Sequence, residues 1–416
     1  MRAGWEDRPL GEVCQFINRG ISPAYLETGG VAVLNQKCVR DHTVNFDLGR
    51  RHDPEAKKVG PERYVRAGDV LVNSTGTGTL GRVAQLREAP PEPTTVDSHV
   101  TIVRPKDGLF YPEFFGYALV AIEEQIQDGG EGCGGQTELS RSKLASGYRI
   151  GFPTDRNEQR RIVAILDEAF EAIATAKANT EKNLRSLRAL LDFTRRDMFA
   201  SLADEHKPTT LSRCCIFENG DRGKNYPGKE HRVAHGVPFI NAGHLTEDGL
   251  DFSQMDYISQ ERFELLGNGK IRPQDVLFCL RGSLGKFACV GDLGRGAIAS
   301  SLVILRPGAG LTNDYLLEFL ASTQCAEQIE RHKGGAAQPN LGAQDLKRFE
   351  LPLPPIEVQQ ATASRLASLR TAVSNARALL STKLATLDEL KKSLLHQAFT
   401  GQLTAKSTDQ QLEAAA

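Results

Sequence analysis

Apolar residues recur with heptad spacing in two long segments of the chain, at about 156–202 and 356–399. The repeat runs from Leu366 to Leu394 in the second segment, and residues about 200 positions earlier follow the same register. Neither segment contains Gly or Pro between its ends, so each is predicted to form one continuous helix, roughly 65–70 Å long. A helix this long with an apolar stripe needs a partner, and we expect the two helices to pack as an antiparallel coiled coil.

The predicted seam of this helix pair consists of apolar residues at heptad positions. These are Leu166, Ile173, Leu187, Leu190, Leu366, Leu369, Val373, Leu380, Leu387 and Leu394. Polar residues interrupt the pattern at Thr180, Asn183 and Lys383. A buried polar residue would fix the register of the pair, whereas a solvated one would not, and the pattern leaves both interpretations open.

The segments in front of the two helices also resemble each other. The run Gly-Asp-Val-Leu at 68–71 leads into a Gly-rich stretch, and Gln-Asp-Val-Leu at 274–277 does the same. A second apolar, β-branched run ends in proline at 98–105 and again at 300–307. Each run is typical of a β-strand bounded by turn residues. The chain is therefore predicted to be an internal repeat in which a strand-rich globule precedes each long helix.

We expect an α+β fold in which two strand-rich α/β domains are separated by two long helices, with a pseudo-two-fold internal repeat. The predicted domains are 1–155 and 206–355, the predicted helices are 156–205 and 356–403, and the tail is 404–416.

Composition narrows the class of protein only slightly. The formal net charge of −1 does not favour a nucleic-acid binder, although a subunit of a larger assembly needs only local basic loops. No stretch reaches the roughly 18 apolar residues of a membrane span, so a cytoplasmic protein is predicted. The eight cysteines form no Cys-x-x-Cys pair, which predicts reduced thiols without a zinc site or a disulfide framework.

No motif predicts catalysis or cofactor binding by this chain. The Gly-rich stretch 75–81 is similar to a phosphate-binding loop but lacks the Gly-Lys-Ser/Thr ending. His231 and His235 have the spacing of a helical zinc pair, but Arg232 occupies the place of a protease glutamate. Motifs of methyltransferases, nucleases and helicases are also missing, so we expect any enzymatic activity to belong to a partner.

The chain as a whole resembles the specificity (S) subunits of type I restriction-modification systems, the HsdS family. The resemblance covers residues 5–403 and is carried by the run at 68–71 and by Pro-Leu-Pro-Pro-Ile-Glu-Val-Gln at 352–359. The family usually has Pro-Leu-Pro-Pro-x-x-Glu-Gln at the latter place. Here Val358 stands where Glu is expected, and in the first copy residues 154–156 replace the prolines, so no specific role is assigned to that glutamate.

The resemblance implies a non-catalytic subunit that recognises double-stranded DNA. Each target-recognition domain would read one half of an asymmetric bipartite site, and the helices would set the spacing, with half-site centres about one turn, roughly 10 bp, apart. Two methyltransferase (M) subunits would dock on the helices, and two restriction/translocase (R) subunits would join for cleavage. S-adenosylmethionine would be bound by the methyltransferase partner, and ATP and Mg by the restriction partner, with no cofactor on this chain.

Polar residues in the predicted loops are candidates for contacts with base edges and phosphates. In the first globule they are Asn18, Arg19, Lys37, Arg40, Asn73, Ser74, Thr75, Thr77, Thr79 and Gln136. In the second globule they are Arg222, Lys224, Asn225, Asn241, His244, Arg281, Ser283, Lys333 and Gln338.

Two other classes of function fit part of the sequence. The first is a coiled-coil scaffold with protein-binding heads, and salt-dependent DNA binding would distinguish it from a DNA-recognition subunit. The second is a nucleotide-using enzyme built on the Gly-rich loops, which a failure to bind ATP or S-adenosylmethionine would exclude.

Overall fold

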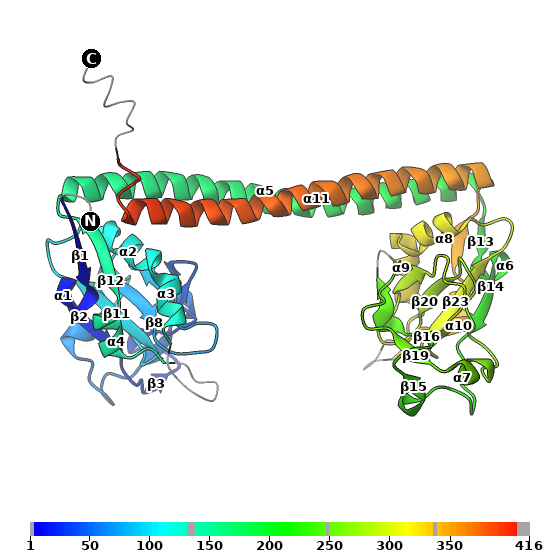
Figure 1. The fold of residues 1–416 in the computed structure, drawn as a ribbon, viewed down its shortest axis with the longest axis horizontal. Helices are drawn as coiled ribbons and strands as arrows, with labels where there is room; N and C mark the ends of the chain where they lie inside the picture. Colours follow the sequence, from blue (N-terminus) through cyan, green and yellow to red (C-terminus); the bar gives the residue numbers. More distant parts are fainter. Residues whose placement is uncertain (1–3, 131–137, 247–248, 336–338, 406–416) are drawn as a thin grey trace, which may run out of the picture. The chain divides into compact units, whose positions relative to one another are not determined.

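The computed structural model describes residues 4–130, 138–246, 249–335 and 339–405 (Figure 1). Contacts divide the chain into two compact units: unit 1 is 1–179 with 382–416, and unit 2 is 180–381. Both boundaries fall inside the long helices α5 (Arg156–Glu205) and α11 (Ile356–Phe399). Each unit therefore contains one globular head together with one part of each long helix.

The head of unit 1 is built on a four-stranded antiparallel sheet in the order β2-β11-β8-β9. A second four-stranded sheet has the order β10-β4-β7-β3, in which β10 and β4 are parallel. A third sheet pairs β1 with β12. The bounds of these strands are β1 Trp5–Pro9, β2 Cys14–Arg19, β3 Tyr25–Leu26, β4 Val31–Leu34, β7 Arg50–His52, β8 Val70–Asn73, β9 Val83–Gln85, β10 Thr94–Val96, β11 Val100–Pro105 and β12 Arg149–Pro153.

Short helices and one hairpin complete this head. The helices are α1 (Leu10–Val13), α2 (Pro112–Ala121), α3 (Glu123–Asp128) and α4 (Arg141–Ser146), with 3-10 turns at Phe46–Leu48 and Pro61–Arg63. The hairpin pairs β5 (Val39–Arg40) with β6 (Thr43–Val44).

The central sheet of unit 1 is covered on both faces. Val70 and Val72 of β8 pack into a core that includes residues of α2, α5 and α11, whereas Leu71 packs into a second core with residues of β4 and β10. Because neighbouring residues of a strand point to opposite faces, a strand buried on both sides must be apolar throughout. This explains why the sequence reads as a continuous apolar run at this place.

The head of unit 2 repeats this architecture. Its main sheet has the order β14-β23-β20-β21, its second sheet has the order β15-β19-β16-β22 with β16 and β22 parallel, and β13 pairs with β24. The bounds are β13 Pro208–Thr210, β14 Cys215–Asn219, β15 Arg232–Val233, β16 Val237–Ile240, β17 Leu245–Thr246, β18 Gly249–Leu250, β19 Asp256–Ile258, β20 Val276–Cys279, β21 Phe287–Cys289, β22 Ala297–Ile298, β23 Leu302–Pro307 and β24 Glu350–Pro352. The helices are α6 Leu211–Cys214, α7 Gln260–Glu264, α8 Asn313–Leu320, α9 Thr323–His332 and α10 Ala343–Leu346, and 3-10 turns lie at Lys229–His231 and Ala242–His244.

Within each unit, α5 and α11 run side by side in opposite directions. In unit 1, Leu166 shares a buried core with Leu395, and Lys177 forms an ion pair with Asp388. In unit 2, Phe199 shares a core with Leu366. Residue numbers rise along one helix as they fall along the other, so the predicted antiparallel helix pair and the predicted α+β fold with an internal repeat are confirmed.

The predicted seam residues are buried to different degrees. Leu166, Leu366, Ile173 and Val373 are buried, and Leu187, Leu369, Leu380, Leu387 and Leu394 are partly buried. Leu190 is 48% exposed, so its predicted place in the seam is wrong. Leu166 and Leu366 belong to the buried cores of the two heads, whereas Leu190 belongs to neither of these cores.

The polar interruptions of the seam do not behave alike. Thr180 is buried, whereas Asn183 and Lys383 are exposed. Among the residues that the structure describes, no helix combines the length and the apolar character that crossing a membrane requires.

Candidate nucleic-acid interface

A buried ion pair holds the central sheet of unit 1 together. Asp69, directly before β8, accepts hydrogen bonds from Nε and Nη2 of Arg104 on β11, both at 2.7 Å. Both side chains are buried, and Arg104 also donates to the carbonyl oxygens of Glu62 (3.1 Å) and Tyr64 (2.9 Å). A bidentate pair of this kind fixes geometry as well as adding attraction. The Gly-Asp-Val-Leu run therefore has a structural role, because its aspartate links β8 to β11.

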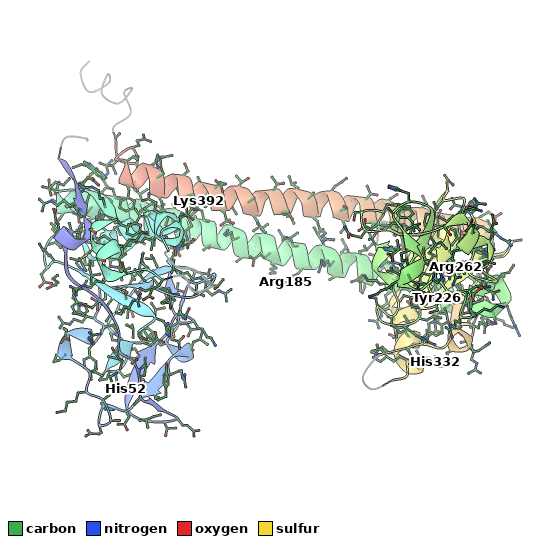
Figure 2. All side chains as sticks on the ribbon, turned by 60° about the horizontal axis from the view of Figure 1, so that its bottom comes forward. His52, Arg185, Tyr226, Arg262, His332 and Lys392 are labelled. Atoms are coloured by element: carbon green, nitrogen blue, oxygen red, sulfur yellow. The ribbon has the colours of Figure 1, made fainter. Side chains whose placement is uncertain are left out.

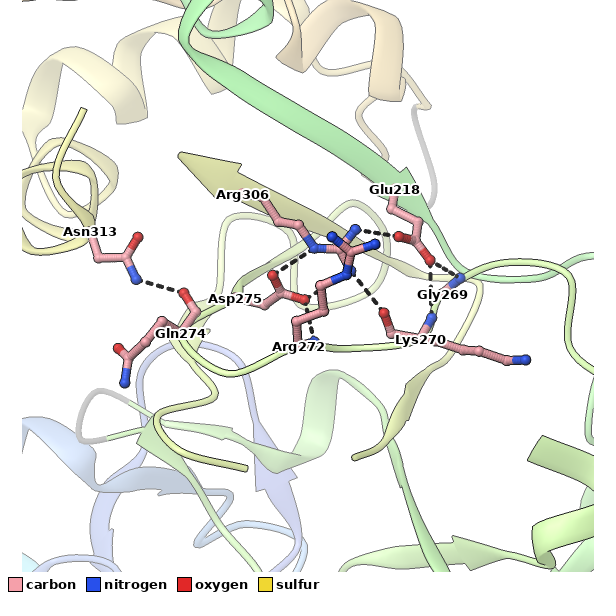
Figure 3. Close-up of polar contacts among 8 residues, drawn as sticks. All are labelled: Glu218, Gly269, Lys270, Arg272, Gln274, Asp275, Arg306 and Asn313. Atoms are coloured by element: carbon pink, nitrogen blue, oxygen red, sulfur yellow. Dashed lines mark hydrogen bonds and ion pairs between the residues drawn. The ribbon is translucent and has the colours of Figure 1, made fainter. Parts of the chain in front are cut away.

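Unit 2 contains the same pair with one addition (Figure 3). Asp275 accepts from Nε of Arg306 at 2.7 Å and from Nη2 at 3.0 Å, and a second carboxylate, Glu218, also binds this guanidinium. Burial favours a higher pKa for Glu218, but Arg306 and the backbone N–H groups of Gly269 and Lys270 hold the pKa below its ordinary value. Arg306 therefore has two carboxylate partners where Arg104 has one.

A buried glutamine joins each head to the start of its long helix. Gln159 accepts from the backbone N–H of Tyr111 (2.6 Å) and donates to the carbonyl oxygen of Pro153 (2.8 Å). Gln359 accepts from Thr312 N–H (2.9 Å) and donates to the carbonyls of Gly310 and Pro354, both at 2.8 Å. This is the Gln at the end of the Pro-Leu-Pro-Pro run, and its role here is structural.

The Gly-rich turns follow β8 and β20 at the opposite end of each sheet from the ion pairs. Gly76, Gly78 and Gly81 have φ values of +101°, +76° and +81°, a region that favours glycine, so the turn after β8 depends on these residues. Each turn is bridged to the loop that precedes the last short helix of its head, at Thr75 with Glu138 and at Arg281 with Asn340. The candidate interface of each head consists of the Gly-rich turn, the bridged loop and the end of one strand. This strand is β2 in unit 1 and β14 in unit 2.

In unit 1 the candidate interface is tied down by its own contacts. Arg19, at the end of β2, forms an ion pair with Glu138 and donates to the carbonyl oxygen of Leu139 at 2.8 Å. Thr75 bonds to Nδ1 of His99 at 2.7 Å, and Thr79 donates to Gln36 at 2.6 Å. This end of the head is rich in hydroxyl groups that can both donate and accept hydrogen bonds.

In unit 2 the same end of the sheet is concave. A cavity of about 560 Å³ is lined by residues after β14, after β20 and before α10, and these include Arg222, Arg281 and Asn340. The two arginines are exposed, and Arg222 is steadied by a hydrogen bond to the carbonyl oxygen of Ser300 at 3.2 Å. The pKa of the nearby Asp221 is lowered by the backbone N–H groups of Gly223 and Gly267. This end of unit 2 therefore presents cationic groups in a hollow surface.

The candidate contact residues fall into distinct groups in the structure. The exposed residues are Lys37, Arg40, Thr77, Arg222, Lys224, Arg281, Ser283 and Lys333. The partly buried residues are Asn18, Arg19, Thr75, Thr79, Asn225 and Asn241. Asn73, Ser74 and His244 are buried. Gln136 and Gln338 lie outside the described residues.

Four of the candidate residues make hydrogen bonds within the protein, and we do not include them among the proposed DNA contacts. Ser74 bonds to Thr101 (2.5 Å), and Asn73 donates to the carbonyl oxygen of Gln36 (3.1 Å). Asn241 caps the turn at Ala242–His244, and His244 accepts from its backbone N–H at 3.1 Å. Asn73 is the last residue of β8 and Ser74 follows it, whereas Asn241 and His244 belong to the capped turn that follows β16. An Asn followed three residues later by a His is a local capping signal that could have identified the last pair.

The junctions between the heads and the long helices were not predicted. In unit 1, the Tyr117 hydroxyl donates to Asp167 of α5 at 2.5 Å, and Arg87 bonds to the same carboxylate at 2.9 Å. In unit 2, the buried Glu318 accepts from Arg195 of α5 at 3.0 Å and from Arg370 of α11 at 2.5 Å. These polar pairs cross from a head to a helix, and no local pattern in the sequence announces them.

Family comparison assigns the chain to a class. The model of the type I restriction modification DNA specificity domain matches residues 2–184 and 216–381. The two matches together cover most of the chain, so this protein belongs to that family.

Individual relatives carry consistent descriptions. The chain is 21% identical over 428 residues to the type I restriction enzyme MjaX specificity subunit of Methanocaldococcus jannaschii, covering 97% of this chain and 94% of that protein. It is 25% identical over 181 residues to the type I restriction enzyme EcoBI specificity subunit of Escherichia coli, covering 43% of this chain and 38% of the relative.

Solved structures share the fold. A chain from a structural study of complex assembly and conformational transition of the type I R-M system has a TM-score of 0.76 at 18% identity, covering 97% of this chain and 99% of that one. The HsdS subunit from Thermoanaerobacter tengcongensis has a TM-score of 0.60 at 19% identity, covering 97% and 98%.

Proposed function

We propose that this chain is the sequence-specific DNA-recognition subunit of a type I restriction-modification complex, in which each head reads one half of an asymmetric bipartite site. One observation carries the proposal: the two heads share the same sheet order and the same buried Asp–Arg pair, but they present different side chains at the same end of the sheet. This end carries Thr75 and Thr77 in unit 1 and Arg281 and Ser283 in unit 2. Two similar heads with different contact residues suit a ligand that has two different half-sites.

The chemistry of the exposed residues supports base and phosphate contacts. The major groove presents a distinct pattern of donors and acceptors for each base pair, and an arginine can bind guanine through two hydrogen bonds. Arg222 and Arg281 line the concave end of unit 2, whereas the hydroxyl groups of unit 1 can act as donor or acceptor. The proposed contact set is Asn18, Arg19, Lys37, Arg40, Thr75, Thr77, Thr79, Arg222, Lys224, Asn225, Arg281, Ser283 and Lys333.

Residues 1–155 and 206–355 are the proposed target-recognition domains, and residues 156–205 and 356–403 are the helices that set the spacing of the half-sites. Specificity subunits of type I restriction systems are non-catalytic, and the family membership places this chain in that class. Two methyltransferase subunits dock on the helices and two restriction subunits join them, and we expect the chain to meet these partners in the cytoplasm. S-adenosylmethionine belongs to the methyltransferase, and ATP and Mg belong to the restriction subunit.

The exposed arginines of unit 2 allow a direct binding test. The chain, in complex with its co-expressed methyltransferase partner, is titrated with a labelled duplex that carries the methylation motif mapped in the host. Arg281→Ala is expected to weaken binding about 10- to 100-fold, because it removes a base contact. Lys224→Ala is expected to lower the slope of log affinity against log salt by about 1.

The matched control for Arg281 is Arg213, an exposed arginine on α6 directly before β14. The candidate interface follows the other end of β14, so Arg213→Ala should bind DNA with unchanged affinity. Equal losses in the two variants would point to a nonspecific charge effect. Binding that does not depend on salt would favour the scaffold alternative, which has no observation of its own in its favour.

A further inference from the structure

A hairpin of unit 1 places a histidine against α11. The loop between β5 and β6 consists of Asp41 and His42, which have φ values of +51° and +59°. Two-residue hairpin loops of this type favour Asn-Gly or Asp-Gly, so a histidine here adopts an uncommon backbone conformation. The strained conformation is held by contacts of the imidazole with two other elements.

The contacts of His42 define which ring nitrogen carries the proton. Nε2 lies 2.7 Å from Oε2 of Glu123 on α3, and the other oxygen of Glu123 accepts from the backbone N–H of Val83 at 2.8 Å. An ionised carboxylate only accepts hydrogen bonds, so Nε2 carries the hydrogen. The lone pair of Nδ1 then faces Nζ of Lys391 on α11, at 3.1 Å. Glu123, His42 and Lys391 form a chain in which each group orients the next.

This chain of groups borders a cavity. The cavity has a volume of about 530 Å³ and opens to solvent, and Lys391 and His42 line it together with Phe46, Tyr117 and Phe170. The aromatic rings provide an apolar wall next to the amine. The cavity is large enough for a small acyl donor to approach Nζ from the solvent side.

Several charged groups surround Lys391. Burial lowers the pKa of the Lys391 ammonium and Lys177 on α5 lowers it further, while Glu123, Asp388 and Asp41 act in the opposite direction and leave the pKa below its ordinary value. Phe170 on α5 also faces the amine, with Nζ 5.2 Å from its ring centroid. The net environment favours the neutral amine more than water does.

We propose that Lys391 is a site of covalent acylation by acyl phosphates, with His42 as the general base and Glu123 as the residue that positions His42. The geometry is that of an activated nucleophile: an amine within hydrogen-bond reach of a base that is itself oriented by a third group. The inference goes beyond DNA recognition and does not depend on it.

The reaction balances without any further reagent. The nitrogen of neutral Lys391 attacks the carbonyl carbon of the acyl phosphate, so that a C–N bond forms and the C–O bond to phosphate breaks, with the electron pair leaving on phosphate. Nδ1 of His42 takes the proton that the nitrogen loses, and the imidazolium then releases it to water. The products are a neutral amide on Lys391 and inorganic phosphate, so the helix loses one positive charge at the hairpin contact.

The internal repeat does not require this arrangement. Leu191 stands 200 positions before Lys391, and Thr323 begins α9 where Glu123 begins α3. The fold of unit 2 is thus built without a lysine or a glutamate at these places. The lysine and the glutamate of unit 1 are therefore not part of the architecture that the two heads share.

The adjacent lysine provides an internal control. Lys392, labelled in Figure 2, is exposed and forms an ion pair with Glu124 at 2.8 Å, and the hydrogen bond with Glu124 raises its pKa. The full-length chain is incubated with acetyl phosphate, and acetylation of both lysines is followed by peptide mass spectrometry. Lys391 is expected to react at least about tenfold faster than Lys392. Equal rates, or a faster reaction at Lys392, would overturn the proposal.

Two variants separate base catalysis from simple exposure. His42→Asn keeps a residue that tolerates a positive φ but removes the base, and the rate at Lys391 should fall about tenfold. Glu123→Gln should move the pH profile of acetylation at Lys391 while leaving that at Lys392 in place. Emission of Trp5, the single tryptophan and a residue of unit 1, confirms that each variant is folded. A wild-type rate and pH profile in both folded variants would show that His42 is not the base.

Discussion

The two units attach their heads to the long helices with different chemistry. The sixth residue of α2 in unit 1 is Tyr117, a neutral hydroxyl that donates to Asp167 of α5. The sixth residue of α8 in unit 2 is Glu318, a buried carboxylate held between two arginines. The same position of the same fold thus carries a polar neutral group in one copy and an ionised one in the other.

The frames of the heads, in contrast, are nearly identical. An Asp–Arg pair joins the two central strands in both units, and a buried glutamine ties the exit of each sheet to its helix. The internal repeat therefore preserves the contacts that hold the sheet together, whereas the contacts at the head–helix junction and at the candidate interface differ between the two copies. Divergence at the interface is what recognition of two different half-sites requires.

The largest effect on stability is expected from removing the carboxylate of the buried Asp–Arg pair. Asp69→Asn leaves the buried guanidinium of Arg104 without a charged partner, which should lower the free energy of unfolding of unit 1 by about 3–5 kcal/mol. Asp275→Asn should cost about half as much in unit 2, because Glu218 still pairs with Arg306. Urea unfolding followed by Trp5 emission measures the stability of unit 1. Hydrogen exchange of the backbone amides of β20 and β23 measures the stability of unit 2. Equal losses in the two units would contradict the role given to Glu218.

Removing a polar contact between a head and its long helix should have a smaller effect on stability, and the effect should differ between the two units. Glu318→Gln leaves the buried Arg195 with only the more distant carboxylate of Asp192, at 3.6 Å, and is expected to destabilise unit 2 by about 3 kcal/mol. Tyr117→Phe removes one hydrogen bond from a partly exposed carboxylate and should cost about 1 kcal/mol in unit 1. Hydrogen exchange of α8 and α2 reports the two changes. A larger loss from the tyrosine variant would reverse the comparison.

The smallest effect on the relative stability of the two units is expected from lowering the pH. Burial raises the pKa of Asp97 in unit 1 above 3.8, so the native state binds its proton first and this group adds stability as pH falls through the raised pKa. The pKa of Glu218 in unit 2 is below 4.5, so its stabilising contribution is lost as pH falls from about 4.5 through the lowered value. As the pH falls below about 4.5, unit 2 should therefore lose protection from hydrogen exchange relative to unit 1, after correction for intrinsic rates. Asp97→Asn and Glu218→Gln should each remove its share of the difference.

The sequence predicts the parts of this fold that depend on periodicity. The heptads identify α5 and α11, and the apolar run at 70–72 identifies a strand that is buried on both faces. It does not reveal which polar residues are internal. Ser74 and His244 are chemically suited to DNA contacts, and only their partners in space, Thr101 and Asn241, show that they are used inside the head.

Leu190 marks the other limit of sequence reasoning. It occupies a heptad position yet is 48% exposed, because a heptad pattern does not state where the helix turns its apolar side away from its partner. The junction residues escaped prediction for a related reason: Glu318 and Arg195 are far apart in the chain and meet only after both helices have packed.

The two heads are proposed to read separate halves of one DNA site. The most direct test is to map methylated adenines in host DNA by sequencing, with the active methyltransferase partner co-expressed alone, with this chain, or with its Arg281→Ala variant. We expect one asymmetric bipartite motif that appears only with the chain, and relaxed base preference in a single half of that motif with the variant. Methylation that does not depend on the chain, or a variant that alters both halves equally, would contradict this proposal.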